Sequence, residues 1–382
     1  MIFKILFHSY PFLLALILLW RFVLPLNIGS KKKFLLGLFL IISASKGYVY
    51  FFTGGKLYEP NLGKIFSFIT NTLSFICIFL FFCVFARDLI NLFYKAIKLK
   101  LHINLISTRS PFIAAIFFSL SFTIALIGTT NGFLAPIVTH KVIYLKDLPK
   151  KAENFTIAHL SDLHISPAVS LSDVQNWVKI TNSTNPDLIV ITGDFVDGGV
   201  LELYEKAQEL FKLQAKYGVY AVSGNHEYYS GYKEWIEFLG KGMIFLENTS
   251  TTITSNDGQK LFYLSGISDK NASRFHQNGP DFKKALENTD KKLPIIMLSH
   301  QPTEAFFIKD KISLMLSGHT HGGQAPILNL LVGNANLGLT KGLYQLGDTQ
   351  VFVSSGTRQW MGFPFRICTP SEIAIIKLKK SK

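Results

Sequence analysis

Four apolar stretches before residue 150 constrain the fold of this chain more than any other feature. They run over residues 11–28, 34–52, 65–86 and 111–130. Each approaches the ~20 residues that an α-helix needs to cross ~30 Å of hydrocarbon. Arg21 and Lys46 interrupt the first two stretches, so each needs either a snorkelling position near a helix end or a partner between helices. Residues 1–140 are therefore predicted to form an all-α bundle of about four transmembrane helices.

The positive charge of the chain lies almost wholly in this apolar half. Residues 1–153 hold 17 Lys and Arg against 4 Asp and Glu, whereas residues 154–382 hold 22 against 21. Basic residues that flank membrane spans explain this excess more simply than a nucleic-acid-binding face does, so the lipid bilayer is the expected partner and no nucleic acid is expected. With 48% hydrophobic and 17% charged residues, the composition also excludes an intrinsically disordered chain.

Loop charges predict the orientation of the bundle. The loops after the first and third stretches carry eight Lys and Arg, and the N-terminus and the loop after the second stretch carry three. The positive-inside rule then assigns the first group to the cytoplasm. Four spans would place the C-terminal domain outside the inner (cytoplasmic) membrane of a multi-pass protein. Lys141, Lys146, Lys150 and Lys151 follow the fourth stretch and argue for the opposite orientation.

Residues 141–153 are polar and are predicted to form a linker, after which a second domain occupies residues 154–382. Here apolar runs rich in Val and Ile alternate with segments of helical periodicity at residues 172–184, 202–216 and 280–288. Ser172 and Asp281 are the expected N-cap residues of two of these helices. Such alternation predicts an α/β domain in which helices cover a sheet.

Five of the apolar runs end in Asp, Asn or His. These residues are Asp162 and His164, then Asp194, then Asn225 and His226, then His300, and finally His319 and His321. In an α/β sheet, residues just past the strand ends line one crevice. A single histidine in such a domain is most often structural, so the prediction of a site depends on the joint pattern.

The residue types in this pattern indicate a metal centre. Carboxylate, amide and imidazole groups without a thiolate suit Mn, Fe, Zn or a similar divalent cation. Without His226, which we expect to have another role, seven of these residues remain as ligands. Seven ligands are too many for one tetrahedral site, so we predict two cations that share one carboxylate. Two cations ~3.5–4 Å apart can act on both the attacking and the leaving oxygen of a phosphoryl displacement.

The motifs resemble those of the calcineurin-like metallophosphoesterase superfamily over residues 155–378. They are D-x-H at Asp162–His164, G-D-x-x-D at Gly193–Asp197, G-N-H-E at Gly224–Glu227, S-H at Ser299–His300 and G-H-T-H at Gly318–His321. The extension G-H-T-H-G-G-Q, which ends at Gln324, is similar to a bacterial branch whose members are often membrane-anchored. Pro-Ser-Glu at residues 370–372 departs from the Pro-Pro-Glu more usual in that branch.

The resemblance implies a four-layer α/β/β/α sandwich with a di-metal site. The implied ligands of the first cation are Asp162, His164 and His321, those of the second are Asn225, His300 and His319, and Asp194 bridges the two. The resemblance also implies that His226 is the catalytic acid or stabilises charge. Asp197 is expected to support the ligands, and Glu227 is either a supporting residue or an ordinary surface glutamate.

Together these features predict a membrane-bound phosphoesterase that hydrolyses a phosphoester or phosphoanhydride with a metal-bridging hydroxide. The expected substrate is a phosphorylated small molecule, lipid-linked or a nucleotide. One alternative is an enzyme like UDP-2,3-diacylglucosamine pyrophosphatase, although its cytoplasmic substrate conflicts with the predicted orientation, and another is a catalytically inactive metal-binding scaffold. The Gly- and Leu-rich segment 322–346 is either an apolar lip that admits a lipid tail or, as we expect, a loop packed on the domain.

Overall fold

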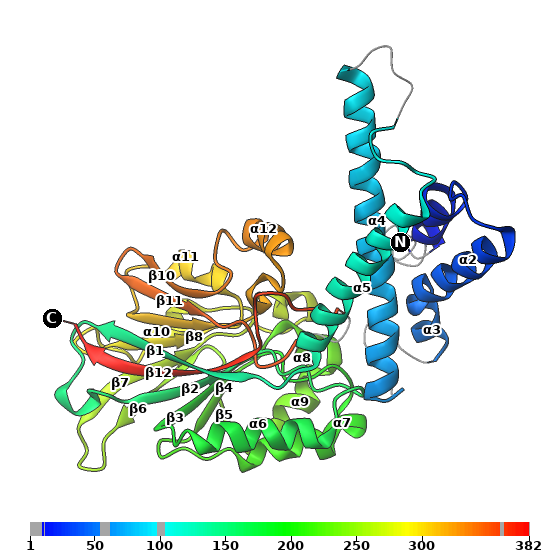
Figure 1. Ribbon diagram of the computed structural model, residues 1–382. Helices are drawn as coiled ribbons and strands as arrows, with labels where there is room; N and C mark the ends of the chain where they lie inside the picture. Colours follow the sequence, from blue (N-terminus) through cyan, green and yellow to red (C-terminus); the bar gives the residue numbers. More distant parts are fainter. Residues whose placement is uncertain (1–9, 11, 54–61, 98–103, 360–362, 382) are drawn as a thin grey trace. The chain divides into compact units, whose positions relative to one another are not determined.

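The computed structural model describes residues 10, 12–53, 62–97, 104–359 and 363–381. The chain divides into two compact units, Met1–Phe133 and Leu134–Lys382 (Figure 1).

Unit 1 is helical. Its elements are the π-helix η1 (Leu19–Val23) and the α-helices α2 (Ser30–Ala44), α3 (Lys46–Phe52), α4 (Lys64–Ile97) and α5 (Pro111–Phe133). Only α4 and α5, among the described residues, are single helices long and apolar enough to cross a membrane, and α2 with α3 could form a third span bent by 52°. By length and composition, the described helices thus offer two or three candidate spans, and the predicted number of about four stays a prediction.

The first predicted stretch differs from a full span. Its apolar helix, Phe12–Val23, is shorter than a membrane crossing, and residue 11 lies outside the described residues. Pro25 follows this helix closely, and proline has no N–H to continue the helical hydrogen bonds. Both charges in the first two stretches find partners on α4, since Arg21 Nε lies 2.8 Å from Asp88 Oδ2 and Lys46 donates to Asn71 Oδ1.

Unit 2 contains two six-stranded sheets. In spatial order the first sheet consists of β1 (Ile137–Leu145), β12 (Glu372–Lys380), β2 (Thr156–Leu160), β3 (Leu188–Thr192), β4 (Val219–Val222) and β5 (Ile244–Phe245). The second consists of β10 (Gly342–Leu346), β11 (Thr349–Val353), β9 (Leu314–Ser317), β8 (Ile295–Leu298), β7 (Lys260–Gly266) and β6 (Thr249–Thr254).

Helices and short 3₁₀ turns connect the strands. The α-helices are α6 (Leu171–Ser183), α7 (Val200–Gln208), α8 (Asn225–Ser230), α9 (Tyr232–Leu239), α10 (Phe282–Leu286), α11 (Ala305–Ile308) and α12 (Pro326–Ala335). The 3₁₀ turns are η2 (Lys150–Ala152), η3 (Glu209–Lys212), η4 (Lys270–Phe275), η5 (Pro302–Glu304) and η6 (His321–Gly323). Asp281 caps α10 as predicted, whereas α6 is capped by Ser170, two residues before the predicted Ser172.

Alternating side chains of the strands build three apolar layers. On β3, Leu188 and Val190 pack between the two sheets, while Ile189 and Ile191 pack against α6, α7 and α9. The outer face of the second sheet packs against α10 and α11. This order of helices, sheet, sheet and helices confirms the predicted four-layer α/β/β/α architecture.

Two segments of unit 2 differ from expectation. Residues 141–145 were predicted as linker, but they belong to β1, where Ile143 and Leu145 are buried in the core between the sheets. Packing of segment 322–346 on the domain was also expected, and Leu339 is buried in the core, but α12 itself buries none of its side chains within the described part of the chain. An apolar sequence specifies that a segment avoids water, but not which partner covers it.

Candidate metal centre

The eight residues predicted at strand ends converge at one edge of unit 2. They lie just after β2, β3 and β4, which are parallel neighbours in one sheet, and just after β8 and β9, which are parallel neighbours in the other. The two sets of residues are in direct contact, because the His319 N–H donates to both carboxylate oxygens of Asp162 at 3.1 Å. The edge therefore places side chains from both sheets in a single cluster.

One group of electron-pair donors surrounds His300. Its Nδ1 donates to the Thr192 carbonyl oxygen at 2.8 Å, so Nε2 is the nitrogen that faces the cluster. Nε2 lies 3.2 Å from Asp194 Oδ2, 3.1 Å from Asn225 Oδ1 and 3.1 Å from His319 Nδ1. Potential ligand atoms of four residues thus lie around one space, and their chemistry fits a cation there.

A second group surrounds His164. Its Nδ1 lies 3.1 Å from the Asp197 carboxylate, which again leaves Nε2 as a lone-pair donor. This Nε2 lies 3.2 Å from His321 Nε2 and 3.7 Å from Asp194 Oδ2, and His321 Nε2 lies 3.5 Å from Asp162 Oδ1. Asp194 Oδ2 therefore lies close to both groups, as a shared carboxylate must.

These contacts define sets of residues whose ligand atoms all lie within 4.8 Å of one another. The sets are Asp162 with His164 and His321, Asp194 with His300 and His319, and His164 with Asp194 and His226. The donor chemistry of the first two sets fits divalent cations, because each joins a carboxylate to imidazole nitrogens and offers no thiolate. Assignment of the seven residues as ligands remains a prediction.

The cluster combines neutral imidazole rings with an ionised carboxylate. Burial, aided by the charge of His300, lowers the pKa of His319 to about 3, and burial beside His164 holds the pKa of His321 well below its usual value. Both rings are therefore neutral, as metal ligands must be. Burial alone raises the pKa of Asp194, but the His300 charge outweighs it and holds this pKa well below the ordinary range.

His226 is placed differently from the predicted ligands. Its Nδ1 lies 2.5 Å from Asp197 Oδ1, and its Nε2 lies 3.9 Å from Asp194 Oδ2. Burial by itself lowers the pKa of His226, but the charges of Asp194 and Asp197 outweigh it and raise the pKa to about 9. The side chain is 16% exposed, so a protonated imidazole reaches both the cluster and solvent.

The backbone of the cluster is unusual. Five of the seven predicted ligands have left-handed φ angles, between 44° and 71°: Asp162, His164, Asp194, His319 and His321. Left-handed backbone is sparsely populated by residues other than glycine and accumulates at functional sites. Gly318 precedes His319, and a Cβ atom at Gly318 would overlap the side chains of Ser161 and Asp162, so glycine is required for this close approach.

Three residues support the cluster, of which Asp197 was expected from the sequence, Glu227 was left undecided and Arg366 was not assigned a role. Glu227 is fully buried, and its carboxylate accepts the N–H groups of Asp194, Phe195 and Gly224 at 2.7–3.0 Å, so it ties together the turns after β3 and β4. Its place in G-N-H-E was the signal in the sequence, but an isolated Glu gives no indication of burial.

Asp197 and Arg366 complete the support. Asp197 accepts from both His164 and His226, so one carboxylate orients a predicted ligand and the predicted acid. Arg366 is fully buried and donates to the carbonyl oxygens of His321 and Ser355 at 3.2 and 2.7 Å. A lone Arg in the C-terminal segment carried no sequence signal for this role.

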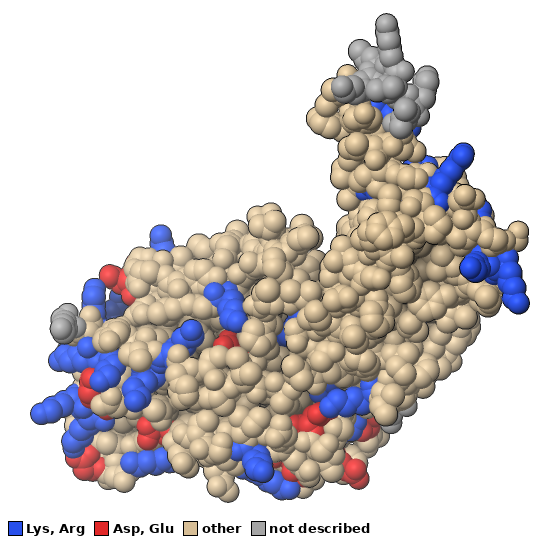
Figure 2. Space-filling view, in the orientation of Figure 1, with Lys and Arg blue, Asp and Glu red and all other residues tan. Residues whose placement is uncertain are grey.

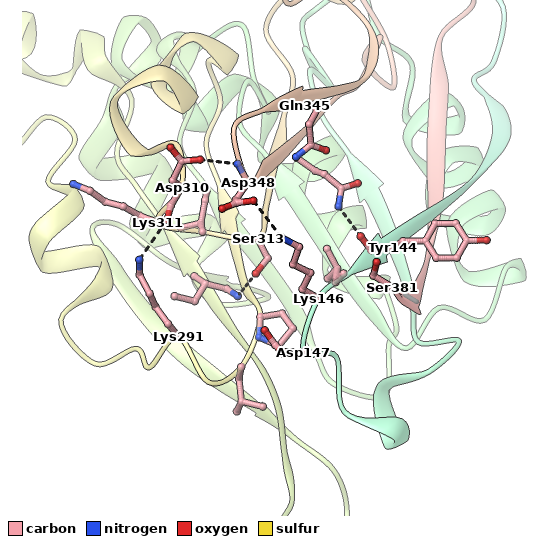
Figure 3. Close-up of a pocket in the computed structure, with 16 residues that line it drawn as sticks. Tyr144, Lys146, Asp147, Lys291, Asp310, Lys311, Ser313, Gln345, Asp348 and Ser381 are labelled. Atoms are coloured by element: carbon pink, nitrogen blue, oxygen red, sulfur yellow. Dashed lines mark hydrogen bonds and ion pairs between the residues drawn. The ribbon is translucent and has the colours of Figure 1, made fainter.

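A cavity of about 530 Å³ lies at the opposite edge of the sheets (Figure 3). It is lined by residues near the start of β8 and the end of β1, and none of the predicted site residues contributes to it. Lysines and aspartates mix in its wall, and Lys146 Nζ lies 3.2 Å from Asp348 Oδ1. Because its charges neutralise one another, this cavity gives no comparable indication of a ligand.

Comparison with known proteins identifies the family of this chain. The family model described as calcineurin-like phosphoesterase matches residues 155–323. A transmembrane protein with metallophosphoesterase domain from Danio rerio is 36% identical over 267 residues, which cover 68% of this chain and 61% of the fish protein. A metallophosphoesterase of Caenorhabditis elegans is 34% identical over 364 residues, covering 90% of this chain and 73% of the relative.

A bacterial relative covers nearly the whole of both proteins. An uncharacterized metallophosphoesterase of Helicobacter pylori is 31% identical over 353 residues, which make up 90% of this chain and 89% of the relative. The chain therefore belongs to the calcineurin-like metallophosphoesterases, a family of phosphoester hydrolases.

Proposed function

We propose that this protein is a membrane-bound hydrolase that cleaves a phosphoester or phosphoanhydride at a two-cation centre, with a lipid-linked or nucleotide substrate. The observation that carries the proposal is the convergence of ligand atoms from His164, His300 and their neighbours around Asp194. The Nδ1 atoms of the two rings are held by Asp197 and by the Thr192 carbonyl oxygen, so each Nε2 faces the cluster. Such an arrangement suits cations better than a hydrogen-bonded structural core.

In this proposal each residue has a separate task. The first cation would be held by Asp162, His164 and His321, the second by Asn225, His300 and His319, with Asp194 shared between them. When bound, the two cations would withdraw charge from the phosphoryl oxygens and lower the pKa of a nearby water.

His226 would supply the proton that the leaving oxygen needs. Because its Nδ1–H is directed to Asp197, the proton available for transfer is the one on Nε2, which points toward Asp194. Asp197 keeps this ring and the His164 ring in fixed orientations, so proton donor and ligand are positioned by the same carboxylate.

Metal removal tests the proposal. We expect the purified full-length protein in detergent to hydrolyse p-nitrophenyl esters, nucleotides or lipid phosphates with Mn, Fe, Zn or Mg, and to lose at least about a hundred-fold in turnover after chelation. Reloading should restore turnover and raise Tm by about 5–10 °C, because a cation at 100 times its Kd stabilises the folded state by about 2.7 kcal/mol. Absence of turnover on every substrate with every metal would contradict the proposal.

We further propose that the protein is a multi-pass protein of the inner membrane with unit 2 on the extracytoplasmic side. The relatives named transmembrane proteins and the apolar helices α4 and α5 support membrane residence. The proposed side follows from the loop charges. A β-lactamase fused after the C-terminus should protect cells against ampicillin, whereas a fusion after Lys33 should not. If only the fusion after Lys33 protects the cells, the orientation is the opposite of the one proposed.

A further inference from the structure

The helix α12 exposes an apolar surface beside the metal centre. Its sequence, PILNLLVGNA, contains no charged residue, and none of its side chains is buried by the described part of the chain. Ile327 is 79% exposed, Leu330 69% and Leu331 66%, and Leu337 just beyond the helix is 61% exposed. Figure 2 shows a surface without Lys, Arg, Asp or Glu at this helix. An apolar surface of this kind marks a contact with lipid or protein.

The position of α12 is fixed by the predicted ligand loop. The helix begins three residues after η6, which contains His321 (Figure 1). The Ala325 N–H donates to the Gly323 carbonyl oxygen at 2.6 Å, and a Cβ atom at Gly323 would overlap the side chain of Asn329. The exposed leucines are therefore held on the same loop as a predicted ligand.

The connection to the membrane helices reaches unit 2 at this same edge. Three residues separate Phe133, the end of α5, from Ile137, the start of β1, and such a connection extends over at most about 14 Å. Ile137 pairs with Glu372, and two residues later Ala374 pairs with His159 near the end of β2. The strand that follows the last membrane helix thus begins at the edge that carries the site.

Backbone contacts connect the start of β1 to the predicted ligands. The Glu372 N–H donates to the Gly356 carbonyl oxygen at 2.8 Å. A Cβ atom at Gly356 would lie 3.1 Å from Asp162 Cβ and 3.3 Å from His321 Nδ1. The start of β1 is therefore linked to the cluster through the backbone at Glu372 and Gly356, and only residues 134–136 separate β1 from α5 along the chain.

We propose that α12 inserts its leucines into the surface of the bilayer and thereby presents the metal centre to the phosphate ester of a membrane lipid. This inference rests on the proposed function and narrows its substrate class. Because acyl chains remain in the bilayer, an enzyme at this depth meets the phosphate without extracting the lipid. An uncharged helix suits that position, whereas a water-facing helix would carry polar side chains.

Paired activity measurements test the inference on the full chain in lipid nanodiscs. We expect Leu330→Glu with Leu331→Glu to lower the ratio of turnover on dioleoylphosphatidic acid to turnover on p-nitrophenyl phosphate at least about tenfold. Leu201 on α7 is 94% exposed and offers a matched control. Leu201→Glu should leave the ratio unchanged. An unchanged ratio in the double variant would overturn the inference.

A probe of depth makes the test independent of turnover. Nitroxide labels are placed at residue 330 or 201 in chains whose three native cysteines are replaced. Relaxation of the label at residue 330 should be enhanced mainly by oxygen, which dissolves in lipid, and relaxation of the label at residue 201 mainly by a water-soluble nickel chelate. Access of the chelate to residue 330, or exclusion of both reagents by a covering protein surface, would refute bilayer insertion. If neither substrate is hydrolysed, the proposed function fails, while the label at 330 still decides the position of α12.

Discussion

Replacing Asp194 with asparagine should lower kcat/KM at least about a thousand-fold and reduce the bound metal below two per chain. Asp194 Oδ2 lies 3.2 Å from His300 Nε2 and 3.7 Å from His164 Nε2, so the same oxygen serves both groups of ligands. Loss of its charge removes several kcal/mol of cation binding, and each 1.36 kcal/mol corresponds to a factor of ten in rate. Turnover and metal content measured on the same sample check this expectation.

Asparagine is the better variant because of the backbone. Asp194 has a φ of 55°, which asparagine tolerates more readily than alanine does. Asp194→Ala should lose turnover as well, but part of its effect would reflect strain in the turn after β3. An Asp194→Asn protein that keeps its fold, two metals and full activity would show that this carboxylate is not shared.

The convergence of the site residues could be predicted from the sequence because it follows from topology. Parallel strands bring their carboxyl ends to one edge, so the polar residues after each apolar run had to meet. The structure places Asp162, Asp194 and His300 together for this reason. The local backbone could not be predicted, since nothing in the residue types signals left-handed φ angles at Asp162 or His319. Those angles are imposed by close approach of the turns.

The burial of the supporting residues could not be predicted from the sequence either. Glu227 read equally well as a surface residue, because glutamate is rarely buried without partners. Its burial becomes favourable when the N–H groups of Asp194, Phe195 and Gly224 converge on it. Burial and the nearby Asp194 charge raise the pKa of Glu227 to about 8. Such groups depend on contacts between distant segments, which no local pattern encodes.

For the apolar segments, too, the sequence did not specify which partner each segment packs against. Hydropathy predicted four spans, and among the described residues the helix of residues 12–23 is shorter than a span and α2 and α3 are separated by a bend. Ile143 and Leu145 were assigned to a polar linker, yet they fill the core between the sheets. For the linker the composition was read correctly, but packing against the other sheet decided where its apolar residues lie.

Replacing His226 with alanine should lower kcat by about a hundred- to ten-thousand-fold on an alkyl phosphate, the usual contribution of a general acid. The loss should be much smaller on p-nitrophenyl phosphate, because nitrophenolate leaves readily without a proton. Both predicted cations should remain bound, since neither of their ligand sets requires His226. His140 on β1 is exposed, and His140→Ala is the matched control that should change neither rate.

The pH dependence gives this prediction a second readout. His226 must be protonated to donate, so activity of the unaltered enzyme on the alkyl ester should fall as the pH rises through its pKa. That alkaline decline should be absent from the residual activity of His226→Ala. Asp197→Asn should weaken the donor and also disturb His164, because Asp197 accepts from both rings. Loss of a metal from His226→Ala would instead identify His226 as a ligand, because its ring lies within reach of a cation beside His164 and Asp194. Equal losses of activity on both substrates would exclude His226 as the acid.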